Sequence, residues 1–496
     1  DLACCAGSSG PGHVHLINGL YDAHRSGAPV LAIASTIISG EFGTTYFQET
    51  DTIRLFDDCS YYNQLATTPG QLPRMLQGAI QTALSRRGVS VIGIPGDLTG
   101  ESQVNIPSSE INYPTHPRTC PSDTELQALA DLLNNNSNIT LFCGIGAKDA
   151  HEEIVELSHR LKAPVAYSFK SKMEIQYDNP NEVGMTVLLG TDFPYGPFLP
   201  THNKIVQIDI DPSHLGRRAK VQMGLCGDIK TTLEALLPLL QAKSDKSFLN
   251  DQLLGYSKVI KDLNAYVENK GSDNKIHPEY VMAMVNETAQ ANAIFTVDTG
   301  MTCVWGARYL KASGQRKMLG SFNHGTMANA MPQAIGASFA YPGRQVIALC
   351  GDGGISMLLG DLATIAQYKL PVKIIVFNNR SLGMVKLEME VAGLPDNETD
   401  MQNPDFALVA QAMGIKSYTV SRPDDVLPVL VEALNSPEAA LLNVMTDPNA
   451  LAMPPQIEWN QMTGFAQAMY KMLLTGRTQE IIHTLNSNYK HLKEIL

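Results

Sequence analysis

The chain has 496 residues, which at roughly 150 residues per domain suggests about three domains. Its 37 Lys and Arg against 49 Asp and Glu give a net charge of 37 − 49 = −12, which argues against a nucleic-acid-binding protein because such proteins need a basic face. A hydrophobic fraction of 44% excludes general disorder, and no apolar run reaches the roughly 18 residues of a membrane-spanning helix. The eight cysteines form no CxxC pair, most of them lie in apolar strings and no secretory leader is visible, so we expect buried thiols in a reducing compartment, the cytoplasm.

Strand-like apolar runs alternate with helix-like segments along the chain. Residues 1–6 already resemble the middle of a strand, so we expect the natural start to lie upstream of Asp1. Near-continuous apolar strands are typical of parallel sheets covered by helices on both faces, and they occur at 30–34, 89–94, 139–142 and 205–208. The pattern predicts an α/β fold of doubly wound parallel sheets, and the proline-rich stretch 101–123 and the polar stretch 267–275 predict two linkers.

Residues 344–388 carry the clearest functional pattern. An apolar strand at 345–350 leads into Gly351-Asp352-Gly353-Gly354, and a second strand at 372–377 ends in Asn378-Asn379. Between the two strands, apolar residues recur at helical spacing, namely Met357, Leu358, Leu362, Ile365 and Ala366. This order predicts a right-handed strand–helix–strand unit.

The two strand ends predict a Mg²⁺–diphosphate site. If the strands are neighbours, about 4.8 Å apart, the oxygens of Asp352 and Asn379 can converge on one cation at the binding edge of the sheet. Two oxygen side chains suit Mg²⁺, which completes its octahedron with phosphate oxygens and water. Gly353 and Gly354 open the following helix, so that unpaired N–H groups can face an anion. The alternative is an ordinary turn followed by an ordinary strand end.

At these residues the chain resembles the thiamine-diphosphate enzymes, whose signature is Gly-Asp-Gly followed at a distance by Asn-Asn. The segments 324–332, 47–49 and 382–385 resemble the pyruvate oxidase branch, and the closest likeness is to its membrane-associated, quinone-reducing members. The resemblance implies three doubly wound domains and a tail. These are a pyrimidine-binding domain (1–112), a central FAD-binding domain (120–266), a thiamine diphosphate and Mg²⁺ domain (276–453), and a membrane-binding regulatory tail (454–496).

The same resemblance assigns roles by motif. Asp352, Asn379 and the backbone carbonyl of Ser381 become the Mg²⁺ ligands. The cofactor would also contact Gly325, Thr326, Met327, Gly353, Gly354, Leu382, Gly383, Met384 and Val385. The residues expected to act in catalysis are Phe47, Gln48, Met327, Met384 and Glu388. Without the flanking motif, core packing would explain Met327 and Phe47 better. The family's cofactor-activating glutamate would lie upstream of Asp1.

The central domain has a weaker flavin pattern. Gly144 and Gly146 follow a strand and precede a helix, where glycines permit close approach of a dinucleotide, and Asp209 ends the strand at 205–208. By resemblance, further FAD contacts come from Thr186, Thr191, Asp192, Phe193, Pro194 and Tyr195. Residues that the family carries between Thr186 and Val187 are absent, and we expect that they were omitted from the chain rather than lost by the protein.

The resemblance implies oxidative decarboxylation of pyruvate to acetate and CO₂, with two electrons passed through FAD to a membrane quinone by a homotetramer. Three alternatives remain. Acetolactate synthase would carry a Gln-rich stretch where this chain has 298–303, and a tryptophan near 386–388. The others are a phosphate-dependent oxidase that makes acetyl phosphate and a catalytically silent flavin-binding scaffold.

The last 41 residues, 456–496, predict two amphipathic helices. Apolar residues of the second segment recur at spacings of three and four, and Lys490, His491 and Lys493 occupy its opposite face. Such a helix can lie at the inner face of the cell membrane. The alternative is a terminal helix docked on its own domain, and the two states could form a switch.

Overall fold

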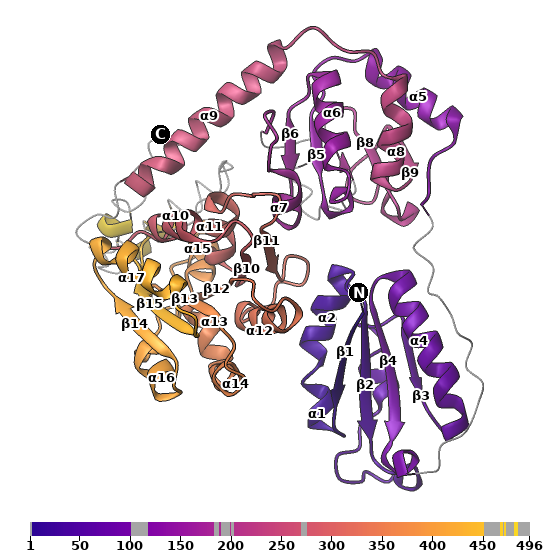
Figure 1. The fold of residues 1–496 in the computed structure, drawn as a ribbon, viewed down its shortest axis with the longest axis vertical. Helices are drawn as coiled ribbons and strands as arrows, with labels where there is room; N and C mark the ends of the chain where they lie inside the picture. The colour runs from indigo at the N-terminus through magenta and orange to yellow at the C-terminus, as the bar shows by residue number, and fades with distance from the viewer. Residues whose placement is uncertain are drawn as a thin grey trace. The chain divides into compact units, whose positions relative to one another are not determined.

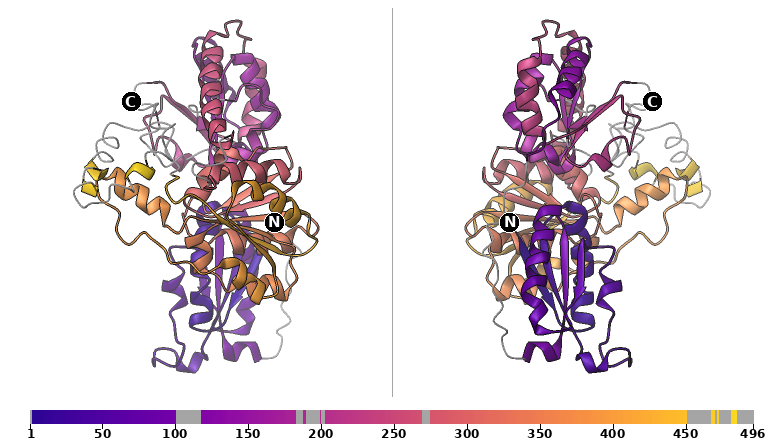
Figure 2. Two further views of the ribbon diagram at one scale, coloured as in Figure 1. Left: turned by 90° about the vertical axis from the view of Figure 1, so that its left-hand side faces the viewer. Right: turned by 90° about the vertical axis from the view of Figure 1, so that its right-hand side faces the viewer.

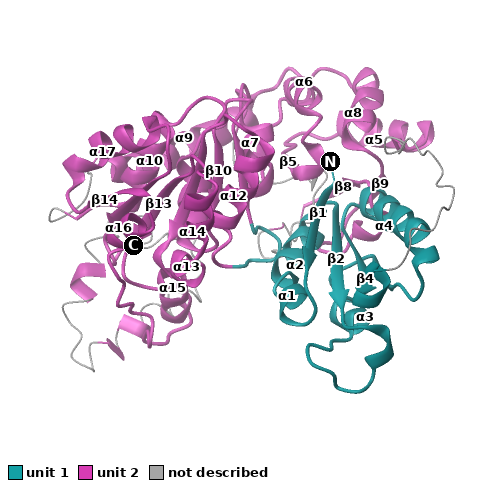
Figure 3. Ribbon diagram, turned by 60° about the horizontal axis from the view of Figure 1, so that its bottom comes forward, with its two compact units in different colours: residues 1–117, 321–326 teal, residues 118–320, 327–496 magenta. Residues whose placement is uncertain are grey.

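The computed structural model describes residues 2–100, 118–182, 188–189, 199, 203–268, 275–450, 467–469, 471–472 and 481–484. The chain forms two compact units, of which unit 1 comprises residues 1–117 and 321–326 and unit 2 comprises 118–320 and 327–496 (Figure 3). The described strands form three sheets in which every pairing is parallel. The predicted α/β class is therefore confirmed, whereas the domain bounds remain predictions. Most of both predicted linkers and most of the predicted tail lie outside the described residues.

Unit 1 contains a four-stranded sheet in the order β1-β2-β4-β3. Its strands are β1 (Ala3–Gly7), β2 (Val30–Thr36), β3 (Tyr62–Leu65) and β4 (Val89–Pro95). Its helices are α1 (Pro11–Val14), α2 (Ile17–Ser26), α3 (Thr52–Leu55) and α4 (Leu72–Arg86). The central strands β2 and β4 are the apolar runs from which strands were predicted, and they bury Ala32, Ala34, Val89 and Val91 against Phe56.

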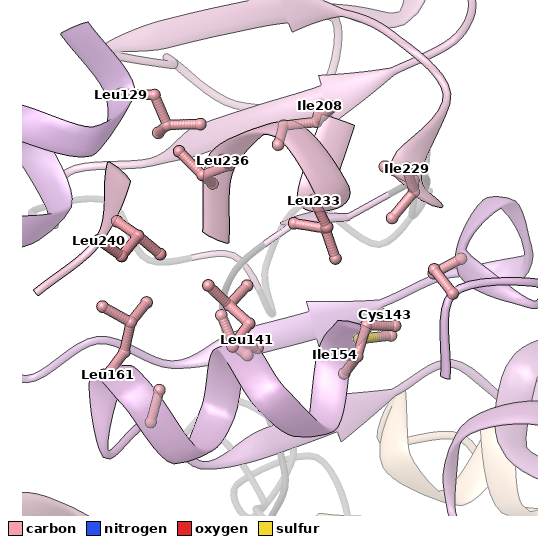
Figure 4. Packing of buried hydrophobic residues seen from close by; sticks show 14 of the residues in the cluster. Leu129, Leu141, Cys143, Ile154, Leu161, Ile208, Ile229, Leu233, Leu236 and Leu240 are labelled. Atoms are coloured by element: carbon pink, nitrogen blue, oxygen red, sulfur yellow. The ribbon is translucent and has the colours of Figure 1, made fainter. Parts of the chain in front are cut away.

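The first sheet of unit 2 has five strands in the order β6-β5-β7-β8-β9. They are β5 (Leu141–Cys143), β6 (Val165–Tyr167), β7 (Leu188–Leu189), β8 (Val206–Asp209) and β9 (Met223–Cys226). The helices are α5 (Asp123–Asn134), α6 (His151–Leu161), α7 (Lys172–Ile175), α8 (Ile229–Leu236) and α9 (Ser247–Glu268). Figure 4 shows leucines and isoleucines of α6 and α8 packed around Leu141 and Ile208 of the sheet.

The second sheet of unit 2 has six strands in the order β11-β10-β12-β13-β15-β14, which are labelled in Figure 1. Figure 2 gives two further views of the ribbon. They are β10 (Ile294–Val297), β11 (Lys317–Gly320), β12 (Val346–Gly351), β13 (Lys373–Asn378), β14 (Lys416–Val420) and β15 (Ala440–Met445). The helices are α10 (Pro278–Thr288), α11 (Met301–Tyr309), α12 (Ala330–Ala340), α13 (Asp352–Met357), α14 (Asp361–Gln367), α15 (Gly383–Val391), α16 (Phe406–Ala412) and α17 (Pro423–Asn435).

The six-stranded sheet is covered on both faces. Successive side chains of a strand point to opposite faces, and every residue of β12 from Val346 to Cys350 is buried. One face packs on Ala330, Leu362 and Phe406 from helices α12, α14 and α16. This double burial is why the strands read as continuous apolar runs.

The helical segment after β12 differs from the sequence prediction. Two short helices, α13 and α14, replace one continuous helix, with Leu358 as the C-cap of the first and Gly360 as the N-cap of the second. Leu362 and Ile365 are buried as expected. Met357 and Leu358 are exposed because they lie at the end of α13, whose buried residues are its first four, 352–355.

Two chain-wide expectations can also be compared with the structure. No described helix is both long and apolar enough to cross a membrane. All eight cysteines are free thiols, and Cys59, Cys143 and Cys350 are buried as expected. The expectation of buried thiols is wrong for Cys4 and Cys120, which are exposed.

Candidate active site

The site lies where β12 and β13 end side by side in the six-stranded sheet. The two strands pair in parallel, with Gly351 opposite Phe377, so Asp352 and the Asn378-Asn379 pair leave the sheet at the same edge. Asp352 is 3% exposed and Asn379 is 9% exposed. The predicted neighbourhood of the two strands is confirmed.

Asp352 is a buried carboxylate held by hydrogen bonds rather than by an ion pair. Its Oδ1 accepts from the Gly353 N–H at 2.9 Å, and its Oδ2 accepts from Asn403 Nδ2 at 2.8 Å. Burial raises the pKa of Asp352, and the hydrogen bonds oppose that rise only in part. Among the described side chains, no lysine, arginine or histidine forms an ion pair with it. A bound cation would supply the missing charge.

The loop after β13 presents further oxygen atoms. Asn379 Oδ1 accepts from the Ser381 N–H at 3.0 Å, and the buried Ser381 hydroxyl has no hydrogen-bond partner. A second segment holds this loop by backbone bonds, from Leu382 N to Thr399 O at 2.8 Å and from Met401 N to Arg380 O at 2.9 Å. The buried hydroxyl is a polar atom that a bound ligand could satisfy.

The two glycines after Asp352 lie in close contact with their surroundings. A Cβ on Gly353 would lie 2.8 Å from Leu382 Cδ2 and 3.2 Å from Met327 Cε, and a Cβ on Gly354 would lie 2.1 Å from Asp298 Oδ2. A side chain at Gly354 would displace the hydrogen-bonded carboxylate of Asp298, whereas at Gly353 the flexible ends of Leu382 and Met327 would have to shift. These contacts also show that Met327 and Leu382 lie at the turn, while their roles in cofactor binding remain predictions.

Asp298 stabilises the glycine turn after β12 through hydrogen bonds to backbone N–H groups. It directly follows β10, is 1% exposed, and accepts from the N–H of Ala330 at 2.9 Å and of Gly351 at 3.2 Å. Burial raises the pKa of Asp298 to about 6. The side chain thus joins the ends of β10 and β12 to the start of α12, and it acts as a structural brace.

The donor set fits a magnesium–diphosphate ligand. The described residues contain no group of three or more His, Cys, Asp or Glu side chains that could hold a metal alone. What they contain is one buried carboxylate and one amide oxygen at a glycine turn, which leaves other positions for phosphate oxygens and water. Asp352, Asn379 and Ser381 could hold the ion, but their assignment as ligands remains a prediction.

Helix α15 carries the remaining predicted residues of this segment. A Cβ on Gly383 would lie 3.0 Å from Asn379 Nδ2, so the helix begins against the site. Met384 is half-buried, whereas Val385 and Glu388 are exposed. The catalytic or cofactor-binding roles of Met384, Val385 and Glu388 remain predictions.

Four predicted residues belong to unit 1. Phe47 is 79% exposed, which excludes core packing as its explanation. Gln48 has a backbone φ of +64°. The Gly325 N–H donates to Ser321 O at 2.8 Å, and Thr326 Oγ1 accepts from Asn18 Nδ2 at 2.7 Å.

The predicted flavin residues lie at one edge of the five-stranded sheet. Gly144 follows β5 and Asp209 ends β8, with β7 between the two strands. Gly146 lies in the exposed turn that precedes α6. Burial raises the pKa of Asp209, whose Oδ1 lies 3.2 Å from His214 Nδ1. The other predicted contacts, namely Thr186, Thr191, Asp192, Phe193, Pro194 and Tyr195, lie outside the described residues.

Two residues of the site were missed by the sequence analysis. Asp298 could have been found, because it directly follows an apolar strand just as Asp352 does. Asn403 donates to both Asp352 Oδ2 and Asn378 Oδ1, at 2.8 and 2.9 Å, but it comes from a loop that no periodic pattern marks.

Models of three protein domains match the chain. They are the N-terminal thiamine pyrophosphate binding domain (residues 1–55), the central domain of thiamine pyrophosphate enzymes (126–195 and 186–236) and the C-terminal thiamine pyrophosphate binding domain (298–444). Thiamine pyrophosphate is another name for thiamine diphosphate. The third match contains Asp298, Asp352 and Asn379.

Similar proteins span most of the chain. YdaP of Bacillus subtilis, described as thiamine pyrophosphate-containing, is 33% identical over 97% of this chain and 86% of its own length. The pyruvate oxidase of Lactiplantibacillus plantarum is 30% identical over 87% of this chain and 75% of its own length. An acetolactate synthase large subunit of Pyropia yezoensis is 28% identical over 94% of this chain and 85% of its own length. The chain therefore belongs to the thiamine-diphosphate-dependent enzymes.

Proposed function

We propose that this enzyme oxidatively decarboxylates pyruvate with thiamine diphosphate, Mg²⁺ and FAD, and passes the electrons to a membrane quinone. The balanced reaction consumes pyruvate, water and quinone, and it yields acetate, CO₂ and quinol. The observation that carries the cofactor assignment is the buried, hydrogen-bonded Asp352 beside Asn379, followed by a closely packed pair of glycines. The similarity to a pyruvate oxidase supports the substrate.

The chain's own residues would bind and orient the reactants. Asp352 and Asn379 would hold the metal that neutralises the diphosphate, and the Gly353-Gly354 turn would let backbone N–H groups approach it. Met327, whose Cε lies near Gly353, would support the cofactor. When bound, thiamine diphosphate supplies the electron sink that decarboxylation needs.

Two features favour an oxidase over acetolactate synthase, although relatives of both kinds match the chain. Where the synthase would carry a Gln-rich stretch, this chain has Asp298, whose carboxylate braces the turn. Where the synthase would carry a tryptophan, the chain has Lys386, which forms a buried ion pair with Asp396 at 3.6 Å. FAD would then act as an electron carrier, held at the sheet edge of Gly144 and Asp209.

The membrane part of the proposal rests on the tail. Four described residues, 481–484, are helical, and Ile482 among them is 51% exposed. Lys471 Nζ donates to Gly393 O at 2.8 Å, just beyond α15, so this part of the tail contacts its own diphosphate domain. We propose that the docked tail moves onto the inner face of the cell membrane on activation, and that the enzyme is a homotetramer.

Product analysis tests the reaction. Enzyme loaded with thiamine diphosphate, Mg²⁺ and FAD is incubated anaerobically with pyruvate and a soluble quinone, with and without phosphate. We expect one acetate, one CO₂ and one quinol per pyruvate, independent of phosphate. Acetolactate without quinol would support a synthase, and phosphate-dependent acetyl phosphate would support the other oxidase. Bound flavin without pyruvate turnover would indicate a silent scaffold.

A further inference from the structure

The loop between β2 and α3 of unit 1 carries Phe47 and Gln48. Most of this loop is exposed, and Gln48 has a φ of +64°, a left-handed conformation that non-glycine residues rarely adopt. A strained residue persists only when its surroundings fix it. The loop must therefore be held by contacts with other residues of unit 1.

His13 of α1 reaches the end of this loop from the interior. It is fully buried, with Nδ1 2.9 Å from Ser35 O and Nε2 2.6 Å from Thr50 Oγ1. A carbonyl oxygen can only accept, so Nδ1 carries the proton and donates it to Ser35. Nε2 is then unprotonated and accepts from the Thr50 hydroxyl. Burial lowers the pKa of His13, which agrees with a neutral ring.

The two hydrogen bonds join three separate segments. Ser35 lies in β2, His13 lies in the helix after β1, and Thr50 directly follows Phe47-Gln48-Glu49 in the chain. The ring also packs edge-on against Phe56, with ring centroids 5.8 Å apart. The imidazole is thus held in one orientation by two bonds and one aromatic contact.

The turn that precedes His13 contacts Gln48 directly. Ser9 Oγ donates to Gln48 O at 3.1 Å, and a Cβ on Gly10 would lie 2.9 Å from Gln48 Cβ. Gly10 has a φ of +65°, so two left-handed residues lie against each other here. The segment 9–13 therefore contacts residues 48–50 and holds them in place.

We propose that His13 is a positioning residue for substrate binding, which acts by fixing Phe47 and Gln48 through Thr50. The proposal rests on the proposed function and on the catalytic roles that the family resemblance implies for Phe47 and Gln48. The rigid imidazole holds the strained backbone of Gln48 between two fixed points. Loss of the hydrogen bond between His13 and Thr50 makes the loop more mobile, and this weakens the binding of the 2-oxo acid.

Thr50 offers a matched pair of variants. Thr50→Val preserves the shape but removes the hydroxyl and leaves Nε2 without its donor, whereas Thr50→Ser retains the hydroxyl. Leaving a buried acceptor without its partner costs about 1–3 kcal/mol, so we expect KM for pyruvate to rise about 5- to 160-fold in Thr50→Val, with kcat changed less than about 2-fold. Thr50→Ser should stay near wild type.

Hydrogen exchange on the cofactor-loaded enzyme provides a readout that does not depend on turnover. Amides of residues 43–50 should exchange faster in Thr50→Val than in wild type or Thr50→Ser. Unchanged exchange in Thr50→Val, or an equal increase in Thr50→Ser, would overturn the fastening. Faster exchange with an unchanged KM would overturn its link to substrate. If wild type does not turn over pyruvate, the proposed function fails, while the exchange comparison still decides whether His13 fastens the loop.

Discussion

At the residue scale, two buried carboxylates of the six-stranded sheet serve different purposes. Asp352 accepts one backbone N–H and one side-chain amide, and its surroundings among the described residues contain no cationic partner. Asp298 accepts backbone N–H groups from two elements and braces the turn. Asp352 is therefore suited to a metal, while Asp298 stabilises the fold.

Asp298 should make the stability depend on pH. Its pKa is raised from 3.8 to about 6, so between about pH 4 and 6 the folded chain keeps a proton that the unfolded chain releases. The contribution of Asp298 to stability therefore falls as pH rises through this window and is constant above it. Asp298→Asn cannot titrate, so the stability of wild type relative to this variant should decrease by up to about 3 kcal/mol across the window. Urea unfolding of both proteins at several pH values measures this stability difference. A stability advantage of wild type over Asp298→Asn that increases with pH would contradict the account.

At the element scale, the glycine turn between β12 and α13 can be tested by adding one methyl group. Gly354→Ala would place Cβ 2.1 Å from Asp298 Oδ2, and we expect a loss of about 1–3 kcal/mol in the free energy of unfolding. Gly360→Ala is the control, because no atom lies within 4 Å of its Cβ and the backbone φ is −61°. Urea unfolding should show little change for the control, and equal losses in both variants would argue against the close packing of the turn.

How far the sequence predicts this region depends on what each residue contacts. The ends of β12 and β13 were predictable because doubly buried parallel strands are continuous apolar runs whose carboxyl ends share one edge. The break between α13 and α14 was not, because helical spacing continues across it while Gly360 starts a new helix. Asn403 and His13 act through tertiary hydrogen bonds, which leave no periodic trace in the sequence.

At the scale of the whole molecule, the proposed membrane switch places regulation in the tail. Deletion of residues 474–496, among which Thr484 is buried, should raise activity with a soluble acceptor, because the proposed docked state loses this segment. The deletion should also abolish binding to liposomes. Ile482→Glu offers a smaller change, because it places a charge on an exposed apolar residue. Liposome flotation measures both variants, and a truncated enzyme that still floats and is still stimulated would contradict the switch.

The central claim is that Asp352 holds the metal and diphosphate of the cofactor. Calorimetric titration of Mg²⁺ and thiamine diphosphate into wild type, Asp352→Ala and the control Asp361→Ala tests it most directly. Substitution of a residue that hydrogen-bonds to a metal ligand typically lowers metal affinity 10- to 100-fold. Loss of the ligand itself should therefore lower the affinity more than about 100-fold. We predict that Asp352→Ala loses cofactor binding but retains flavin, and that Asp361→Ala binds both. Wild-type cofactor affinity in Asp352→Ala would contradict the account.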